Sequence, residues 1–309
     1  MKRLATKGAK MNPKSLLLTL TILLLTGCNL NNSPLFSDSK PIQQKVMEVQ
    51  KKALIVGVSD YAGSESDLSG VQVDVKNMQQ LFTEWGFDVT VLRDEKSMEL
   101  EQYLARYENL DSNDKFIFYY SGHGSHTKDI SGDEADGEDE ALVLSDGETN
   151  ELFLDDSLFG YLNAIKAKKM VMFDSCHSGT AFRGLKILGD KPRVKSLGSD
   201  LKHLFKIIKT RTFSSKQKNI NSGEYVVFSA SQDDEQSLDT KEGGMFTNAF
   251  YKQMKMNNGK NIKMINLPEL MTKNIKTWCQ TSDSIAHHPN LSASSDSIRD
   301  SSIRAFLDL

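Results

Sequence analysis

The chain has 309 residues, of which 39% are hydrophobic, so it can bury one substantial core and is near the upper size for a single one. Its formal net charge of −3 provides no overall positive field, which argues against nucleic acid as a partner. Only local clusters of charge are therefore informative about function.

The N-terminus has the pattern of a bacterial export signal. Residues 1–14 are basic, and the apolar run over residues 15–26 has the length of a signal-peptide core and is short for a membrane span. The run ends in Leu25-Thr26-Gly27-Cys28, which resembles a bacterial lipobox, so we expect Cys28 to be lipidated. An uncleaved membrane anchor is the alternative.

Three segments follow from this pattern. We predict a lipoprotein signal peptide over residues 1–28, a flexible tether rich in Ser, Asn and Pro over 29–50, and one folded domain over 51–309. This order places the domain at the cell envelope of a bacterium, facing the periplasm or the exterior.

The domain alternates buried strands with amphipathic helices. Continuous apolar runs and apolar residues at helical spacing distinguish the two. Strands are predicted over residues 52–59, 87–92, 116–121, 171–175 and 225–230, with a C-terminal edge strand over 304–309. Helices are predicted over residues 71–85, 97–110, 154–167, 247–254 and 267–278, and an exposed basic loop over 183–222. This order predicts an α/β fold, a three-layer αβα sandwich with a mostly parallel central sheet.

Two of the strands end in turns that carry reactive side chains. The run over 171–175 ends at Cys176, and the run over 116–121 ends at His123, which lies between two glycines. Parallel strands that end side by side would bring both residues to one sheet edge. There the imidazole can activate the thiol and protonate a leaving amine, and the N–H groups of Gly124 and Cys176 can form an oxyanion hole. Each residue alone could be structural, but the pair favours nucleophilic catalysis.

The two turns resemble those of a known family. Tyr119-Tyr-Ser-Gly-His-Gly-Ser125 and Phe173-Asp-Ser-Cys-His-Ser-Gly-Thr180 are similar to the histidine and cysteine blocks of metacaspases and their bacterial relatives, which are cysteine peptidases of the caspase-like fold. The resemblance extends from about residue 51 to the C-terminus and includes an acidic block between the two motifs. Because the cysteine does not stand in the Gln-Ala-Cys-x-Gly of true caspases, aspartate specificity is not expected.

The resemblance also implies a pocket for a basic side chain. Asp174 lies two residues before Cys176, where metacaspases place the floor of the pocket for the residue before the scissile bond. An unpaired buried carboxylate in a cleft favours a cationic ligand, here Lys or Arg. Ser121 and Asp74 match the other pocket residues of the family. Without the resemblance, Asp74 would as readily be a solvated charge on a helix.

An acidic segment over residues 129–140 separates the two motifs. It is not an EF-hand, because Glu134 occupies the position that needs glycine. All-oxygen ligands favour calcium, although a solvated acidic loop explains these residues equally well. The resemblance implies a calcium site built from three aspartates, Asp139, Asp155 and Asp156. Arg183 stands near the place of a further acidic ligand of the family, so this match is incomplete.

The basic stretch has a possible role of its own. Between Arg183 and Lys218 the basic residues are opposed only by Asp190 and Asp200. An enzyme that cuts after Lys or Arg would find a tethered substrate in such an exposed loop, and we therefore expect self-cleavage there. Contact with anionic lipid near the anchor is the alternative.

Two hypotheses about function result. The first is a lipid-anchored cysteine endopeptidase that cleaves proteins or peptides after Lys or Arg and is stimulated by calcium. The second is a catalytically silent caspase-fold binding or adaptor module at the cell envelope. The joint presence of Cys176, His123, Gly124 and Asp174 favours the enzyme, because an adaptor would not need all four.

Overall fold

The structure is a computed structural model and describes residues 48–128, 138–176, 193–197, 205–207, 220–230, 237–256, 259–279 and 288–309. The predicted signal peptide, its Cys28, nearly all of the tether, residues 129–137 of the acidic segment and most of the basic stretch lie outside these residues. Among the helices in the described ranges, none is long and apolar enough to cross a membrane.

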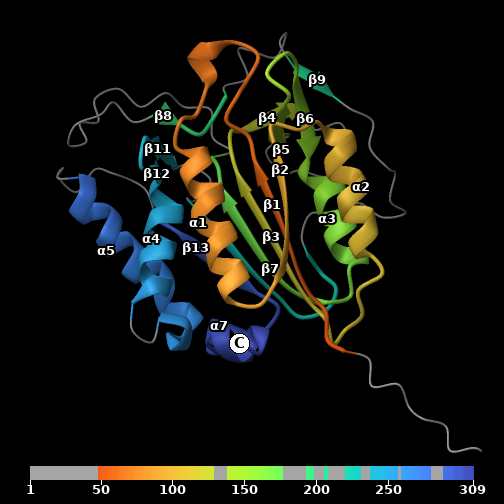
Figure 1. Ribbon diagram of the computed structural model, residues 1–309, viewed down its shortest axis with the longest axis vertical. Helices are drawn as coiled ribbons and strands as arrows, with labels where there is room; N and C mark the ends of the chain where they lie inside the picture. Colours follow the sequence, from red (N-terminus) through yellow and green to blue (C-terminus); the bar gives the residue numbers. More distant parts are fainter. Residues whose placement is uncertain are drawn as a thin grey trace, which may run out of the picture. The chain divides into compact units, whose positions relative to one another are not determined.

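A six-stranded sheet forms the centre of the domain (Figure 1). Its order is β13-β10-β7-β3-β1-β2, and every pairing is parallel except that of the edge strand β13. The strands are β1 (Lys51–Gly57), β2 (Asp88–Arg93), β3 (Lys115–Ser121), β7 (Lys168–Asp174), β10 (Tyr225–Ser229) and β13 (Asn290–Ala293). The near-continuous apolar runs are explained by burial, because β3 is buried at every residue. The predicted α/β class is confirmed.

Helices cover both faces of this sheet. On one side α1 packs against α4, and α4 against α5, while α2 and α3 lie together on the other side (Figure 1). Their bounds are α1 (Val71–Glu84), α2 (Ser97–Tyr107), α3 (Asp155–Ala164), α4 (Met245–Lys255) and α5 (Leu267–Cys279). Along the chain, β2 is added on one side of β1, and β3, β7 and β10 are then added one after another on its other side. Because crossovers are right-handed, α1, which joins β1 to β2, lies on one face, and α2 and α3, which lead in the opposite direction, lie on the other. The carboxyl ends of β1 and β3 flank the point of reversal, where α/β folds bind ligands.

Two small sheets stand beside the main one. The first has the order β4-β5-β6-β9 and the second the order β12-β11-β8. Their strands are β4 (Gly124–Lys128), β5 (Glu138–Ser145), β6 (Asn150–Leu154), β9 (Phe205–Ile207), β8 (Arg193–Val194), β11 (Leu238–Thr240) and β12 (Gly243–Gly244). They were not predicted. The strands β8, β9, β11 and β12 have only two or three residues and give no periodicity, whereas the buried apolar run Ala141-Leu-Val-Leu144 of β5 is a recognisable strand signal that the prediction missed.

Two predictions were wrong. The C-terminal residues form α7 (Ile303–Leu307), whose first turn is capped by the Ser302 hydroxyl, and β13 takes the edge of the sheet instead. The basic stretch is not exposed throughout, because Lys195 and Leu197 are buried. Short helical turns complete the fold: η1 (Ser64–Ser66), η3 (Gly259–Asn261), η4 (Met264–Asn266) and α6 (Asp296–Arg299).

Candidate active site

The register of the sheet brings the two reactive side chains together. Ser121 at the end of β3 pairs with Asp174 at the end of β7. His123 and Cys176 each follow two residues later, so both leave the sheet at the same edge, and both are buried. The two motifs therefore end side by side, as the sequence predicted.

A segment of the chain itself occupies the space between these motifs. The carbonyl oxygen of Lys195 accepts hydrogen bonds from the N–H groups of Gly124 and Cys176, each at 3.0 Å. The Lys195 N–H in turn donates to the carbonyl of Ser237 at 3.0 Å. Two backbone donors on one carbonyl oxygen form the arrangement that stabilises a developing oxyanion during acyl transfer. Relative to Cys176 and His123, Lys195 thus has the position that a peptidase substrate's residue before the scissile bond would have.

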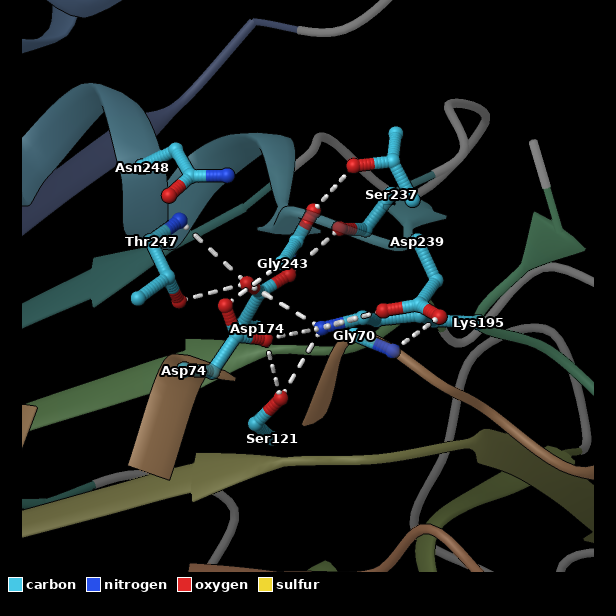
Figure 2. Close-up of polar contacts among 12 residues, drawn as sticks. Gly70, Asp74, Ser121, Asp174, Lys195, Ser237, Asp239, Gly243, Thr247 and Asn248 are labelled. Atoms are coloured by element: carbon cyan, nitrogen blue, oxygen red, sulfur yellow. Dashed lines mark hydrogen bonds and ion pairs between the residues drawn. The ribbon is translucent and has the colours of Figure 1, made fainter. Parts of the chain in front are cut away.

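The side chain of Lys195 enters an acidic pocket (Figure 2). Its Nζ lies 2.9 Å from Asp74 Oδ2, 3.2 Å from Asp174 Oδ2 and 3.9 Å from Asp239 Oδ1. It also donates to the Ser121 hydroxyl at 2.9 Å. Asp74 comes from α1, Ser121 from β3, Asp174 from β7 and Asp239 from β11. The three residues that the resemblance assigned to this pocket therefore converge on one ammonium group.

Neighbouring groups hold the carboxylates in place. Asp174 accepts from the Ser237 hydroxyl at 2.6 Å, and from the Thr247 hydroxyl and N–H at 2.6 and 3.2 Å. Asp74 accepts from the N–H of Gly244 at 2.8 Å. A Cβ at position 244 would collide with Asp174 and Lys195, so this site requires glycine. Sequence reasoning missed Asp239, Ser237 and Thr247, because no local pattern marks them.

Burial and charge pairing act against each other on the pKa values of Asp74, Asp174 and Lys195. Burial raises the pKa of Asp74 to about 6, in spite of the ammonium group beside it. Burial acts in the same direction on Asp174, but Lys195 and the hydrogen bonds from Ser237 and Thr247 hold the pKa of Asp174 below its usual value. Burial would lower the pKa of Lys195, yet the surrounding carboxylates raise it above its usual range. Lys195 is therefore a buried cation whose charge the pocket compensates.

The imidazole of His123 is oriented by backbone and aromatic groups. Its Nε2 lies 2.7 Å from the carbonyl oxygen of Ser66, and its ring packs 4.6 Å from the Tyr61 ring. A carbonyl can only accept, so Nε2 carries the proton and Nδ1 keeps its lone pair. Nδ1 forms no hydrogen bond within the described residues, although the nearby Lys195 carbonyl acts on the ring to raise the His123 pKa. Burial dominates and lowers this pKa to about 4.

The thiol of Cys176 is turned toward the backbone of Ser237. Sγ lies 3.3 Å from the Ser237 carbonyl oxygen and also accepts from the Ser237 N–H. Burial raises the pKa of the thiol to about 12. With a neutral thiol and a neutral imidazole, the pair is in an unreactive protonation state, since the thiolate is the nucleophile.

The predicted calcium ligands lie where β5 meets the start of α3. Asp139 is buried in β5, and Asp155 and Asp156 form the first turn of α3. Burial raises the pKa of Asp155 to about 8, with further contributions from Glu140, Asp156 and Asp139. Four carboxylates therefore share one region. In the ranges that the structure describes, no group of three or more His, Cys, Asp or Glu side chains is arranged to hold a metal ion.

A cysteine and a histidine at the carboxyl edge of a parallel sheet, with paired backbone donors beside them, define the class of caspase-like α/β proteins. In sequence, residues 50–294 match the family model of the caspase domain, which is a peptidase family. The chain belongs to this caspase-domain family, as its two motifs indicated.

Individual relatives point the same way. Metacaspase-1 of Scheffersomyces stipitis is 28% identical over 251 residues, covering 65% of this chain and 60% of the relative. Metacaspase-1 of Pyricularia oryzae is 33% identical over 169 residues, covering 50% and 41% respectively. A crystal structure of a Geobacter sulfurreducens protein superposes with a TM-score of 0.61 at 21% identity over 82% of this chain and 97% of that one, which shows the shared fold. The matches thus span at most about three fifths of these curated relatives.

Proposed function

We propose that the protein is a cysteine endopeptidase that cleaves after Lys or Arg. The observation that carries this proposal is Lys195, whose side chain fills the acidic pocket while its carbonyl oxygen accepts from the Gly124 and Cys176 N–H groups. Membership in the caspase-domain family supports the reaction type. The pocket supports the basic specificity, because three buried carboxylates need a cation.

The reaction assigns a separate role to each group. Nδ1 of His123 takes the proton of the Cys176 thiol, and the thiolate attacks the carbonyl carbon of the P1 residue, the one before the scissile bond. The N–H groups of Gly124 and Cys176 stabilise the oxyanion, and the imidazolium returns the proton to the leaving amine. Water then hydrolyses the thioester, with His123 again acting as the base.

The same geometry identifies the first bond to be cut. With Lys195 in the pocket, the Lys195–Ser196 bond occupies the position of a scissile bond, and the segment excludes other substrates until it is cleaved. This narrows the expected self-cleavage from the stretch 183–218 to one bond. Sγ must first turn from Ser237 toward the Lys195 carbonyl, so the described state precedes reaction.

The test uses the full chain and its Cys176→Ala variant. We expect the full chain to cut itself after Lys195 and then to hydrolyse short Arg- and Lys-terminated amides, while the variant does neither. N-terminal sequencing of the fragments checks the site, and amide turnover checks the specificity. A chain that cleaves no basic amide would support the alternative, an adaptor module in which Lys195 closes the pocket permanently.

We also propose that calcium binds at the carboxylates of Asp139, Asp155 and Asp156 and stimulates the enzyme. The repulsion that helps to raise the Asp155 pKa supports this, since a divalent cation would relieve it. Binding requires the three side chains to turn toward one another, because within the described residues they are not arranged around a common metal position. The test is the melting temperature of the Cys176→Ala chain with and without calcium, compared with the same chain carrying Asp155→Asn. A calcium-dependent rise that Asp155→Asn abolishes is expected, and an equal melting temperature in both conditions contradicts the site.

The cell-envelope location remains part of the proposal. It rests on the pattern of residues 1–28, with Cys28 as the lipidated residue and the membrane as a partner. Replacing Cys28 with Ala is expected to release the protein from the membrane fraction. Retention of this variant in that fraction would favour the uncleaved anchor.

A further inference from the structure

The chain segment in the site is bound beyond its lysine. Val194 pairs with Leu238 and Arg193 with Asp239, so β8 extends the small sheet as an antiparallel strand beside β11. Peptides that add a strand to a sheet edge take their affinity from the backbone and their specificity from alternate side chains. Because side chains alternate along a strand, Arg193 and Lys195 point to the same face, where both find acceptors.

The guanidinium of Arg193 is bound by backbone oxygens. Its Nη1 lies 2.6 Å from the carbonyl oxygen of Asp67, 2.9 Å from that of Glu65 and 3.5 Å from that of Ser64. These residues belong to η1 and its C-cap, in the loop that joins β1 to α1. Convergent carbonyl oxygens accept hydrogen bonds and cannot donate them, so this loop selects a side chain rich in donors.

The exposed Arg193 side chain lies at the wall of an acidic cavity. The cavity has a volume of about 780 Å³, and its lining includes Asp60, Glu65, Asp67 and Asp239 together with Arg193 itself. The carboxylates add a negative field to the carbonyl acceptors, and Glu65 and Asp60 are exposed to solvent. This site adjoins the acidic pocket that holds Lys195 and shares Asp239 with it, but the carbonyl oxygens that bind Arg193 belong to the 64–67 loop alone.

The same loop orients the catalytic base. The Ser66 carbonyl, which holds His123 Nε2, lies in the sequence between the carbonyls of Glu65 and Asp67, which hold Arg193. A guanidinium that binds the two flanking peptide groups restrains the one between them. Filling this site therefore fixes the imidazole that must accept the thiol proton.

We propose that the 64–67 loop is a second specificity subsite, which recognises a basic residue at P3, the third residue before the scissile bond, and thereby orients His123. The inference rests on the proposed peptidase function and extends it to the substrate class Arg-x-Lys or Arg-x-Arg. All three carbonyl oxygens are reached by one nitrogen, Nη1, so the site requires a cationic donor at the end of a long side chain, which arginine supplies in this chain.

Three tripeptide amides test the subsite on the self-processed enzyme: Arg-Val-Lys, citrulline-Val-Lys and norleucine-Val-Lys. We expect kcat/KM to fall about tenfold from Arg to norleucine, the usual loss for hydrogen bonds to a charged group, with citrulline between them. A fall in kcat as well as a rise in KM is expected, because the site acts on the base. Equal kcat/KM for all three, with lysine still required at P1, overturns the subsite and leaves the peptidase function intact.

A second measurement does not depend on catalysis. In the full chain with Cys176→Ala, the N–H groups of Lys195 and Leu197 are bonded to Ser237 and Gly124, so their hydrogen exchange reports how firmly the segment is held. Adding Arg193→Ala is expected to speed this exchange about tenfold. Arg193→Lys should have a smaller effect, and Lys76→Ala, which removes the same charge from an exposed position on α1, should have none. Unchanged exchange in the Arg193→Ala chain overturns the proposal, even if no peptide is hydrolysed.

Discussion

The lysine pocket and the Cys176–His123 pair lie side by side but are in opposite electrostatic states. In the pocket each carboxylate faces a buried ammonium, and Asp174 accepts three further hydrogen bonds from Ser237 and Thr247. In the catalytic pair both groups are neutral, and Nδ1 has no hydrogen-bond partner among the described residues. The charges of the pocket are thus fully paired, whereas the thiol and imidazole are not arranged as an ion pair. Under the proposed function, this difference means that the pocket binds a basic side chain before the thiol becomes reactive.

The largest effect is expected from removing the nucleophile. Cys176→Ala should lower both self-cleavage and amide turnover by about 10⁴-fold or more, as loss of a catalytic nucleophile does. The fold should persist, because Cys176 is buried and its replacement by alanine removes only one sulfur atom from the packing. Turnover and circular dichroism measure the two effects. Cys279→Ala serves as the control at the other cysteine of the domain and should keep full activity, whereas residual cleavage in Cys176→Ala would assign the nucleophile elsewhere.

The charge of the pocket is tested by Asp174→Asn, which keeps the shape of the side chain. Transition-state binding of a lysine substrate should weaken by about 3–5 kcal/mol, the usual cost of breaking a buried charge pair. The measurement is the ratio of kcat/KM for lysine and norleucine amides. Asp239→Asn provides a matched comparison with a smaller loss, since its oxygen lies 3.9 Å from the ammonium. A ratio that Asp174→Asn leaves unchanged would make Asp174 structural.

The neutral state of the catalytic pair predicts how stability depends on pH. Burial lowers the His123 pKa from 6.5 to about 4, so the unfolded chain binds a proton at a pH where the folded chain does not. The contribution of the neutral His123 imidazole to the free energy of unfolding is fully present above pH 6.5 and is lost as the pH falls toward 4. Each pH unit in this range costs about 1.4 kcal/mol, so the total loss is about 3 kcal/mol. Urea unfolding of the Cys176→Ala chain at pH 7 and 4.5 measures this loss. The same chain with His123→Gln should lose correspondingly less stability, and an equal loss in both chains contradicts the buried neutral imidazole.

The smallest effect is expected at a group that only supports the pocket. Ser237→Ala removes the hydroxyl that donates to Asp174 at 2.6 Å and should weaken lysine selectivity by about 1.5 kcal/mol. Thr247→Ser keeps the equivalent donor to the other carboxylate oxygen and should change the selectivity little. Kinetics with the same two amides distinguish the variants. Equal selectivity in both would mean that Asp174 does not depend on its hydrogen bonds.

The sequence by itself determined the elements whose signal is local. Strands β1, β3 and β7 follow from continuous apolar runs, and α1 from helical periodicity, because burial leaves a regular pattern in each segment. The turns at His123 and Cys176 were found for the same reason, since each directly ends such a run. The C-terminal helix α7 was mistaken for a strand because five residues are too few to distinguish the two periods.

Only the tertiary structure decided what fills the site. Lys195 is one of many basic residues in a stretch without periodicity, and nothing local distinguishes it from its neighbours. Its partners Asp74, Asp174 and Asp239 come from three elements far apart in the chain, as do the backbone donors Gly124 and Cys176. The Arg193 site is made of carbonyl oxygens, which every residue possesses and which therefore leave no trace in the sequence. Side-chain chemistry could be predicted from the order of the residues, but the convergence of backbone and charge depends on how the chain folds around the sheet edge.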